Sequence, residues 1–477
     1  MNVTTKSLTM LLLLALGAFA LTGCSDDDEN PMTPDMGSGA MLRVVHASPD
    51  APAVDIYAEG VSAPLLTDVS YTETSAWLDL AAGTYNIQLR AAGADPASAP
   101  AYETGDLTVP AGATITALAV GLLGSTDADA RFRVIPLVED WQDPGSGNAA
   151  VRLVHGSADA PAVAIDVGND GTPEISGFAR FADSGADGVP LPAGAALDVG
   201  IWAGSPLSRV TAFRTPALPE ANIILVATGL VGERPRDADG FGLLAVGPAG
   251  TIGLIRQNPS VFVLHGSPDA PAVDVFVSGT DVELIDALAF GELSAPVQVA
   301  PGSYALDVKV AAGGATAATI TTPELMAGER YLVVASGFVG GSQPGFTVLP
   351  LAEQFADDMD ARVRVVHASP DAPAVDVGVV TADKAFTPLA PFSDLAFGAA
   401  SEATGLSVGP AALTLGVAAT GTIDPVATFD VTLSAGQQAF AVAAGSLTGT
   451  GEGFRLMLVD TTGFPWVTAS VLPNGMN

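Results

Sequence analysis

The feature that most constrains this chain is a motif that occurs four times. It reads RVVHASPDAPAVDI at 43–56, RLVHGSADAPAVAI at 152–165, FVLHGSPDAPAVDV at 262–275 and RVVHASPDAPAVDV at 364–377. The chain has four histidines, and each occupies the same place in its motif. Self-similarity at a fixed period indicates repeated structural units. Because 477 residues are also too many for one hydrophobic core, we expect four tandem domains, called copies 1 to 4 below.

The segments between the motifs predict an all-β fold. They are short, rich in Val, Ile, Leu and Thr, and bounded by Gly, Pro, Asn and Asp, as in PGSYALDVKV at 301–310. About seven strands per copy favour a two-sheet β-sandwich of the immunoglobulin-like or transthyretin-like kind. The alternative is a β-propeller in which each copy makes two four-stranded blades. Polar linkers at 143–148 and 356–360 favour separate beads, which would extend about 100–120 Å end to end.

The N-terminus has the pattern of a bacterial lipoprotein leader. Lys6 precedes an apolar run that is too short for a membrane-spanning helix, and Leu21-Thr22-Gly23-Cys24 resembles the site cut by lipoprotein signal peptidase. Cys24 is the single cysteine, and we expect it to be the lipidation site. Ser25 in the next position resembles the signal for the outer membrane, on its periplasmic or surface face. Residues 25–40 are acidic and contain Pro and Gly, so they predict a flexible tether.

The expected organisation follows from these boundaries. We predict a signal peptide at 1–23, an acylated cysteine and acidic tether at 24–40, and four β-sandwich repeats at 41–148, 149–258, 259–360 and 361–477, the last with a C-terminal tail.

Charge narrows the range of partners. The chain carries 52 Asp plus Glu against 18 Lys plus Arg, a formal net charge of −34. Such a surface repels phosphates, so we expect no nucleic-acid partner and no binding to anionic lipid headgroups. Membrane contact would come through the lipid anchor, and an extracellular protein or glycan remains a possible partner.

The repeated motif resembles the hallmark of a bacterial family known as domain of unknown function 4397, a His-x-Ser-Pro-Asp-Ala-Pro-Ala-Val-Asp run near the domain start. The resemblance covers roughly residues 41–460 and implies an envelope or extracellular protein built from β domains. It implies no activity. Copy 2 departs from the pattern, with Ala158 in place of the first proline and Ala164 in place of the last aspartate.

The polar residues of the motif have three interpretations. The structural one is that His46, Ser48 and Asp50 end a strand, that Ser48 and Asp50 accept backbone N–H bonds in a turn fixed by the prolines, and that His46 pins this turn to a neighbouring strand. A catalytic triad is disfavoured because such close neighbours cannot orient the base from the side opposite the nucleophile. The same structural role is expected for the equivalent residues His155, Ser157, Asp159, His265, Ser267, Asp269, His367, Ser369 and Asp371.

Metal binding is the intermediate interpretation. Asp50 and Asp55 offer oxygen ligands for calcium, and His46 offers a nitrogen for a softer metal. A loop at 166–174 in copy 2 loosely resembles a calcium loop but has no acid at its twelfth position. We therefore expect no metal site, no catalytic residue and no cofactor.

Two function classes remain. The first is a non-enzymatic envelope lipoprotein that displays four β domains as an adhesion or interaction module, or as a structural spacer. The alternative is an extracellular protein or enzyme that binds a glycan or small ligand at a site in one divergent copy, for which copy 2 is the first candidate.

Overall fold

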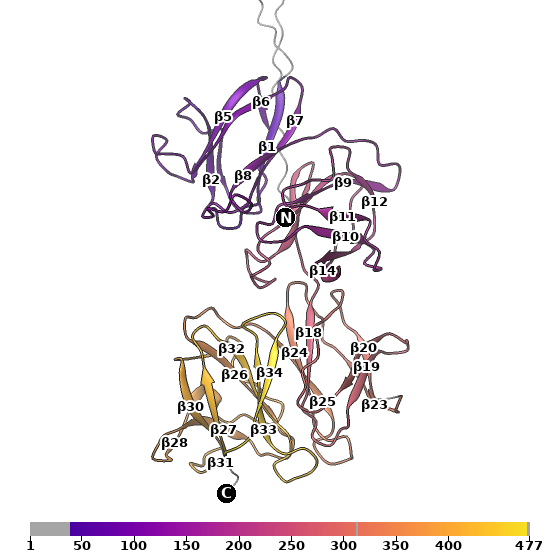
Figure 1. Ribbon diagram of the computed structural model, residues 1–477, viewed down its shortest axis with the longest axis vertical. Coiled ribbons are helices and arrows are strands. Elements are labelled where there is room, and N and C mark those ends of the chain that lie inside the picture. Colours follow the sequence, from indigo (N-terminus) through magenta and orange to yellow (C-terminus); the bar gives the residue numbers. More distant parts are fainter. Residues whose placement is uncertain (1–38, 312, 475–477) are drawn as a thin grey trace, which may run out of the picture.

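Each copy folds into a sandwich of two β-sheets in the computed structural model, which describes residues 39–311 and 313–474 (Figure 1). In copy 1 the two sheets have the strand orders β4-β1-β7-β8 and β3-β2-β5-β6. Strands β1 and β7 pair in parallel, and their neighbours pair antiparallel. The strands of copy 1 are β1 (Ala40–His46), β2 (Val54–Ala58), β3 (Leu66–Val69), β4 (Leu78–Leu80), β5 (Gly83–Ala91), β6 (Tyr102–Val109), β7 (Thr114–Val120) and β8 (Arg133–Val138).

Copies 2, 3 and 4 repeat this topology, and copies 2 and 4 add a fifth strand to the first sheet. Copy 2 contains β9 (Asn148–His155), β10 (Val163–Val167), β11 (Ile175–Phe178), β12 (Val189–Pro192), β13 (Asp198–Ala203), β14 (Ser208–Arg214), β15 (Asn222–Thr228), β16 (Gly242–Gly247) and β17 (Gly250–Arg256). Copy 3 contains β18 (Ser260–His265), β19 (Val273–Val277), β20 (Glu283–Leu288), β21 (Val297–Gln298), β22 (Ala305–Val310), β23 (Thr316–Thr321), β24 (Arg330–Ser336) and β25 (Thr347–Ala352). Copy 4 contains β26 (Ala361–Ala368), β27 (Val375–Val380), β28 (Phe386–Pro388), the short 3-10 helix η1 (Ala390–Phe392), β29 (Leu406–Val408), β30 (Ala411–Ala419), β31 (Pro425–Leu433), β32 (Gln438–Ala444), β33 (Arg455–Asp460) and β34 (Val467–Val471).

The architecture is a β-sandwich, as the sequence predicted, and the propeller alternative is wrong. The eight sheets are separate and are not blades around a common axis. An immunoglobulin sandwich places strands A, B, E and D in one sheet. Here the first and second strands lie in different sheets, which leaves the transthyretin-like arrangement of the two that were expected. Within the described ranges, no helix is long and apolar enough to cross a membrane.

The first sheet of each copy is buried on both faces. In copy 1, Leu42 and Val44 of β1 pack against the second sheet of the same copy, whereas Val45 belongs to a different cluster that includes residues of copy 2. This second burial explains why β7 and β16 have almost no exposed side chains, although a half-buried strand exposes every other one.

The copies are therefore paired, and the prediction of separate beads is wrong. Copies 1 and 2 share one apolar cluster, and copies 3 and 4 share another. Figure 1 shows the two pairs one above the other along the long axis. The polar linkers favoured separate beads, but the outer faces of the first sheets carry enough apolar surface to hold neighbouring copies together. The shared clusters are Val45, Ala47, Leu118, Val120 and Leu137 with Val154, Ile224, Val226, Leu244 and Val246, and Phe262, Leu264, Leu332, Val334, Leu351 and Phe355 with Val366, Ala368, Phe440, Val442, Ala444, Met457, Val459 and Trp466.

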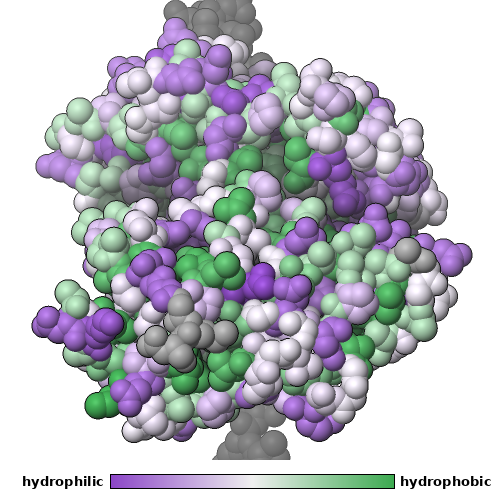
Figure 2. Space-filling view, turned by 60° about the horizontal axis from the view of Figure 1, so that its bottom comes forward, coloured by the Kyte–Doolittle hydropathy of each residue, from purple (hydrophilic) through white to green (hydrophobic). Residues whose placement is uncertain are grey.

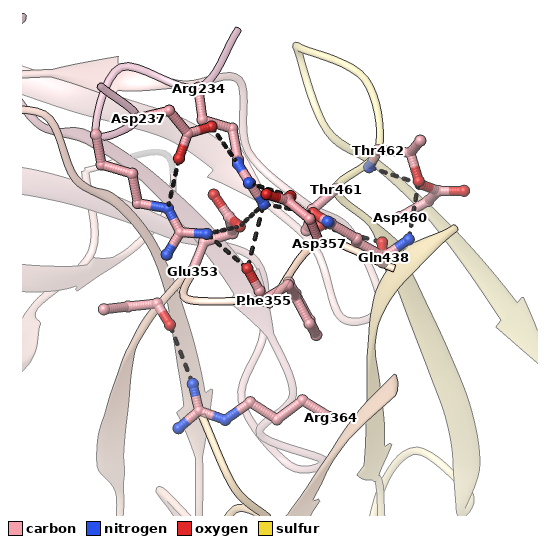
Figure 3. A network of polar contacts seen from close by, with 12 residues as sticks. Arg234, Asp237, Glu353, Phe355, Asp357, Arg364, Gln438, Asp460, Thr461 and Thr462 are labelled. Atoms are coloured by element: carbon pink, nitrogen blue, oxygen red, sulfur yellow. Dashed lines mark hydrogen bonds and ion pairs between the residues drawn. The ribbon is translucent and has the colours of Figure 1, made fainter. Parts of the chain in front are cut away.

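An ion-pair network joins copy 2 to the second pair of copies (Figure 3). Arg236 of copy 2 donates to the Glu353 carboxylate at 3.2 Å and to the Phe355 carbonyl at 2.8 Å. Arg234 pairs with Asp237 at 2.8 Å and with Asp357. Glu353 is only 2% exposed, and this burial raises its pKa although the arginines oppose the shift. The network ties copy 2 to the segment that connects copies 3 and 4.

Candidate functional site

The motif histidine closes its own loop. His46 ends β1, is buried, and places Nε2 at 3.1 Å from the Pro52 carbonyl. A carbonyl oxygen only accepts, so Nε2 carries the proton and Nδ1 is free to accept. The same bond recurs at 2.9 Å, 3.1 Å and 2.9 Å from the equivalent histidines to Pro161, Pro271 and Pro373.

Burial disfavours the charged form of the motif histidines. Burial lowers the pKa of all four below 6.5, and the hydrogen bond to the proline carbonyl opposes this shift without overcoming it. The imidazole ring fills the interior of the loop and donates one hydrogen bond, from Nε2 to the proline carbonyl. The sequence predicted that the histidine pins the turn to another strand; the structure instead places its partner six residues along the same loop.

The motif serine makes the long-range connection. Ser48 is fully buried, and its hydroxyl donates to the Gly121 carbonyl at 2.7 Å. We expected this hydroxyl to accept a local N–H, so that detail is wrong: it donates, and its partner follows β7. The equivalent bonds, from Ser157 to Gly229, Ser267 to Gly337 and Ser369 to Gly445, measure 2.8, 2.6 and 2.6 Å.

The glycine that receives this bond has a fixed conformation. Gly121 has a φ of +82°, and a Cβ there would lie 2.5 Å from the Arg131 carbonyl oxygen. Both facts demand glycine. This explains the Gly that follows the apolar run in every copy.

The motif aspartate caps the loop after the same strand. Asp50 accepts from the backbone N–H groups of Leu123 at 2.7 Å and Gly124 at 2.8 Å, one for each carboxylate oxygen. Asp159, Asp269 and Asp371 make the equivalent pairs of bonds. At Asp371 burial raises the pKa, but hydrogen bonds from Thr448, Leu447 and Ser446 outweigh it and lower the pKa to about 2. The aspartate accepts N–H bonds, as expected, but from a loop far along the chain.

These bonds give His46, Ser48 and Asp50 geometric roles. Ser48 Oγ donates to Gly121 and lies 3.2 Å from Asp50 Oδ1, and His46 Nδ1 receives the Ser48 backbone N–H at 3.4 Å. A nucleophile requires its hydroxyl to donate to the base. The three side chains lie together, but the Ser48 hydroxyl donates to the Gly121 carbonyl instead of to the His46 ring.

The second carboxylate of the motif caps turns in the other sheet. Asp55 accepts from the N–H groups of Asp68 and Gly93, both at 2.9 Å. Copy 2 has Ala164 here and compensates two residues later, where the fully buried Asp166 accepts from Asp170, Gly171 and the Trp202 indole. The calcium-like loop of copy 2 therefore directs its first carboxylate onto protein donors.

Two features were missed at the sequence level. The arginine of the motif reaches the neighbouring copy: Arg43 donates to the Gly247 carbonyl at 2.6 Å, and Arg152 to the Val138 carbonyl at 2.7 Å. A lone arginine within an apolar strand is the signal that could have shown this. The second feature is a group of carboxylates in copy 3, Asp274, Glu283 and Asp286, whose oxygens lie within 4.8 Å of one another. Asp274 already accepts the Ala287 N–H at 2.8 Å.

Cys24, the predicted lipidation site, lies outside the described residues, as do the predicted leader and most of the predicted tether.

Comparisons with known proteins identify the family of the repeats but indicate no activity. The model of a family described as "Domain of unknown function (DUF4397)" matches residues 40–166, 259–378 and 361–470. No curated protein matches the chain. Among solved structures, one described as "The Bacillus anthracis TIE protein" shares 8% identity, covers 86% of this chain and 68% of its own, and has a TM-score of 0.15. So low a score supports no structural argument.

Proposed function

Since the chain belongs to the family described as "Domain of unknown function (DUF4397)", whose name states no activity, we propose a function from its architecture: a non-enzymatic lipoprotein of the cell envelope that presents four β domains for adhesion or another interaction. The anchor would be acylated Cys24, with the outer membrane as its location. The partner would be an extracellular protein or glycan.

The pairing of the copies is the observation that carries this proposal. A spacer gains reach when its domains lie end to end, and face-to-face packing gives up much of that reach. Two apolar interfaces and the ion-pair network instead hold four domains in fixed relative positions. Rigid presentation lowers the entropic cost of binding through several copies at once. Interaction is therefore favoured over spacing.

The surface chemistry sets the kind of partner. Among the described residues, burial removes three arginines and five carboxylates from the surface, so the exposed surface stays strongly acidic, in keeping with the net charge of −34. On the face in Figure 2, hydrophilic side chains are interspersed with small hydrophobic areas. Such a face suits a basic or hydrogen-bonding partner and disfavours anionic polymers.

The anchor is tested with Cys24→Ala. Labelled palmitate should be incorporated into the wild-type chain and not into the variant, which should be released from the membrane fraction. A matched control, Ser25→Ala, keeps the cysteine and should still be labelled. Continued acylation of the Cys24→Ala chain would contradict the proposed anchor.

The interaction is tested with the full mature chain carrying Cys24→Ala, immobilised and exposed to surface proteins and glycans of neighbouring cells. We expect a surface component to be retained. Its retention should fall when free chain is added as a competitor and when the salt concentration is raised. Attachment of living cells should fall when the wild-type chain is replaced by the unanchored variant. Equal attachment by both strains, together with no retained component, would refute the proposal.

A further inference from the structure

The interior of copy 2 contains a hollow. It has a volume of about 270 Å³ and lies between the two sheets. A second lobe of about 40 Å³ adjoins it and shares Leu153, Ile165 and Leu225 as walls. In copy 1 the corresponding space is about 20 Å³.

The wall of the cavity is almost entirely apolar. Two side chains in it are polar: Thr215 accepts the Leu197 N–H at 2.9 Å, and Glu174 accepts the Val167 N–H at 2.7 Å. A buried water needs two to four polar partners, which this wall does not provide. The core residues that line the cavity include Leu153, Ile165, Leu197, Val199, Ile223 and Leu225.

Two smaller side chains on the strand β13 side of the cavity contribute to the space. Four residues before the strand position that pairs with the middle of the motif strand, copy 1 has Tyr85 and copy 3 has Tyr304, whereas copy 2 has Leu197. The tyrosine hydroxyls donate to the carbonyls of Ala81 and Ala300, at 2.9 and 2.6 Å. Copies 2 and 4 both lack this ring, because copy 4 has Leu413 there. Two residues on, copy 2 has Val199, where copy 1 has Ile87 and copies 3 and 4 have Leu306 and Leu415, so Val199 is what distinguishes copy 2 from copy 4.

The opening lies at one side of the sandwich. Strands β11 and β12 are the edge strands of their sheets and both contribute to the wall. Glu174 and Pro190 are exposed there, while Ile223 and Leu225 at the far end are buried. A carboxylate at the opening of a cavity in a strongly acidic chain disfavours anionic ligands.

We propose that copy 2 binds a small, uncharged, apolar molecule in this cavity, of the size of one or two aromatic rings. The ligand gains dispersion contacts and leaves water, and the wall needs no polar group to hold it. Apolar cavities of about 150 Å³ already bind benzene, so this one accommodates a larger molecule. The site lies between the sheets of copy 2 and is separate from the proposed interaction surface.

Indole is a suitable probe, titrated by calorimetry into the full mature chain carrying Cys24→Ala. We expect one site per chain and a melting temperature that rises with indole concentration. Indole-3-acetate, its anionic relative, should bind at least tenfold more weakly because of Glu174 and the net charge.

The decisive variant is Leu197→Tyr, which restores the ring found in copies 1 and 3 and should weaken indole binding at least tenfold. The matched control is Leu413→Tyr, the same change at the equivalent position of copy 4, which should bind as the wild type does. If Leu197→Tyr does not fold, Val199→Leu, the residue of copies 3 and 4, should still weaken binding severalfold. Absence of binding up to the solubility limit of indole, or equal binding by wild type and the filling variants, overturns the proposal and leaves the cavity as a packing defect.

Discussion

Phe262 provides a direct test of the pairing of copies 3 and 4. It lies on β18, where the other three copies have arginine, and is fully buried. Its ring stacks on Trp466 of copy 4, with ring centroids 4.4 Å apart and an interplanar angle of 12°. Phe262→Ala therefore removes apolar volume between the copies rather than inside copy 3.

The expected cost follows from this burial. A buried Phe→Ala change costs about 3–5 kcal/mol, through lost transfer free energy and the cavity left behind. In a cooperative unit of about 200 residues, 1 kcal/mol shifts the melting temperature by about 2–4 °C. We expect Phe262→Ala to lower the melting transition of copies 3 and 4 by about 6–20 °C, with both copies affected.

Hydrogen exchange measured by mass spectrometry distinguishes the copies within the full chain. Peptides from β30 and β31 of copy 4, which do not contain the substitution, should exchange faster in Phe262→Ala. Phe276→Ala is the matched control: that ring is half-buried on the other sheet of copy 3, under Lys309 at 4.0 Å. It should cost about 1 kcal/mol or a little more and leave copy 4 unchanged. Wild-type exchange in copy 4 of the Phe262→Ala chain would refute the shared core.

Three further outcomes are expected. Ser48→Ala leaves the Gly121 carbonyl without its buried donor and should lower the free energy of unfolding, measured in urea, by about 1–3 kcal/mol. Asp50→Ala should cost less because that carboxylate is exposed. A chelator should change the unfolding of neither variant. Burial lowers the pKa of the four histidines below 6.5, so the unfolded chain binds more protons than the folded chain as the pH falls. The histidines' contribution to stability is therefore complete above pH 6.5 and is lost as the pH falls toward their folded-state pKa values. NMR titrations of the rings that give pKa values at or above 6.5 would contradict this. Arg236→Met removes the nearer arginine from the buried Glu353 carboxylate and leaves Arg234 at 3.9 Å, so it should cost about 3 kcal/mol. Glu353→Gln should cost clearly less because burial already raises the pKa of that carboxyl, and equal losses in thermal melts would argue against this network.

The sequence predicted the repeats and the sandwich because both depend on local patterns. Turn residues and short β-branched runs identify strands wherever they later pack. It also predicted that Asp50 accepts backbone N–H bonds. It did not reveal that the donors are Leu123 and Gly124, more than 70 residues away, because the partner of a loop is set by the tertiary fold.

The pairing of copies was missed because the apolar runs were interpreted as strands with one buried face. In ITALAV at 115–120 and IILVAT at 223–228, polar side chains are nearly absent, which is the pattern of a strand buried on both faces. In β7, Ile115 and Ala117 face the core of copy 1, while Leu118 and Val120 face copy 2. Side chains on the second face need a partner, and in a tandem array the nearest partner is the next copy.

The residue after each motif histidine differs between the two members of each pair. Copies 1 and 4 have Ala there, and copies 2 and 3 have Gly. The carbonyls of Ala47 and Ala368 accept from Thr228 of copy 2 at 2.8 Å and from Ser336 of copy 3 at 2.6 Å. A Cβ at Gly156 would lie 2.9 Å from a methyl carbon of Val120, and one at Gly266 would lie 3.3 Å from Ala444 Cβ.

Each pair therefore joins one copy of the alanine type to one of the glycine type, in the order alanine, glycine, glycine, alanine along the chain. Two alanine-type copies would bring a methyl group against Val120 or Ala444 and would lack the hydroxyl donor. Two glycine-type copies would have the donors but would leave space where Val120 packs. Steric fit and one buried hydrogen bond thus favour pairs of unlike type. Copy 1 with copy 3 would also be such a pair, so tandem order selects copy 1 with copy 2 and copy 3 with copy 4.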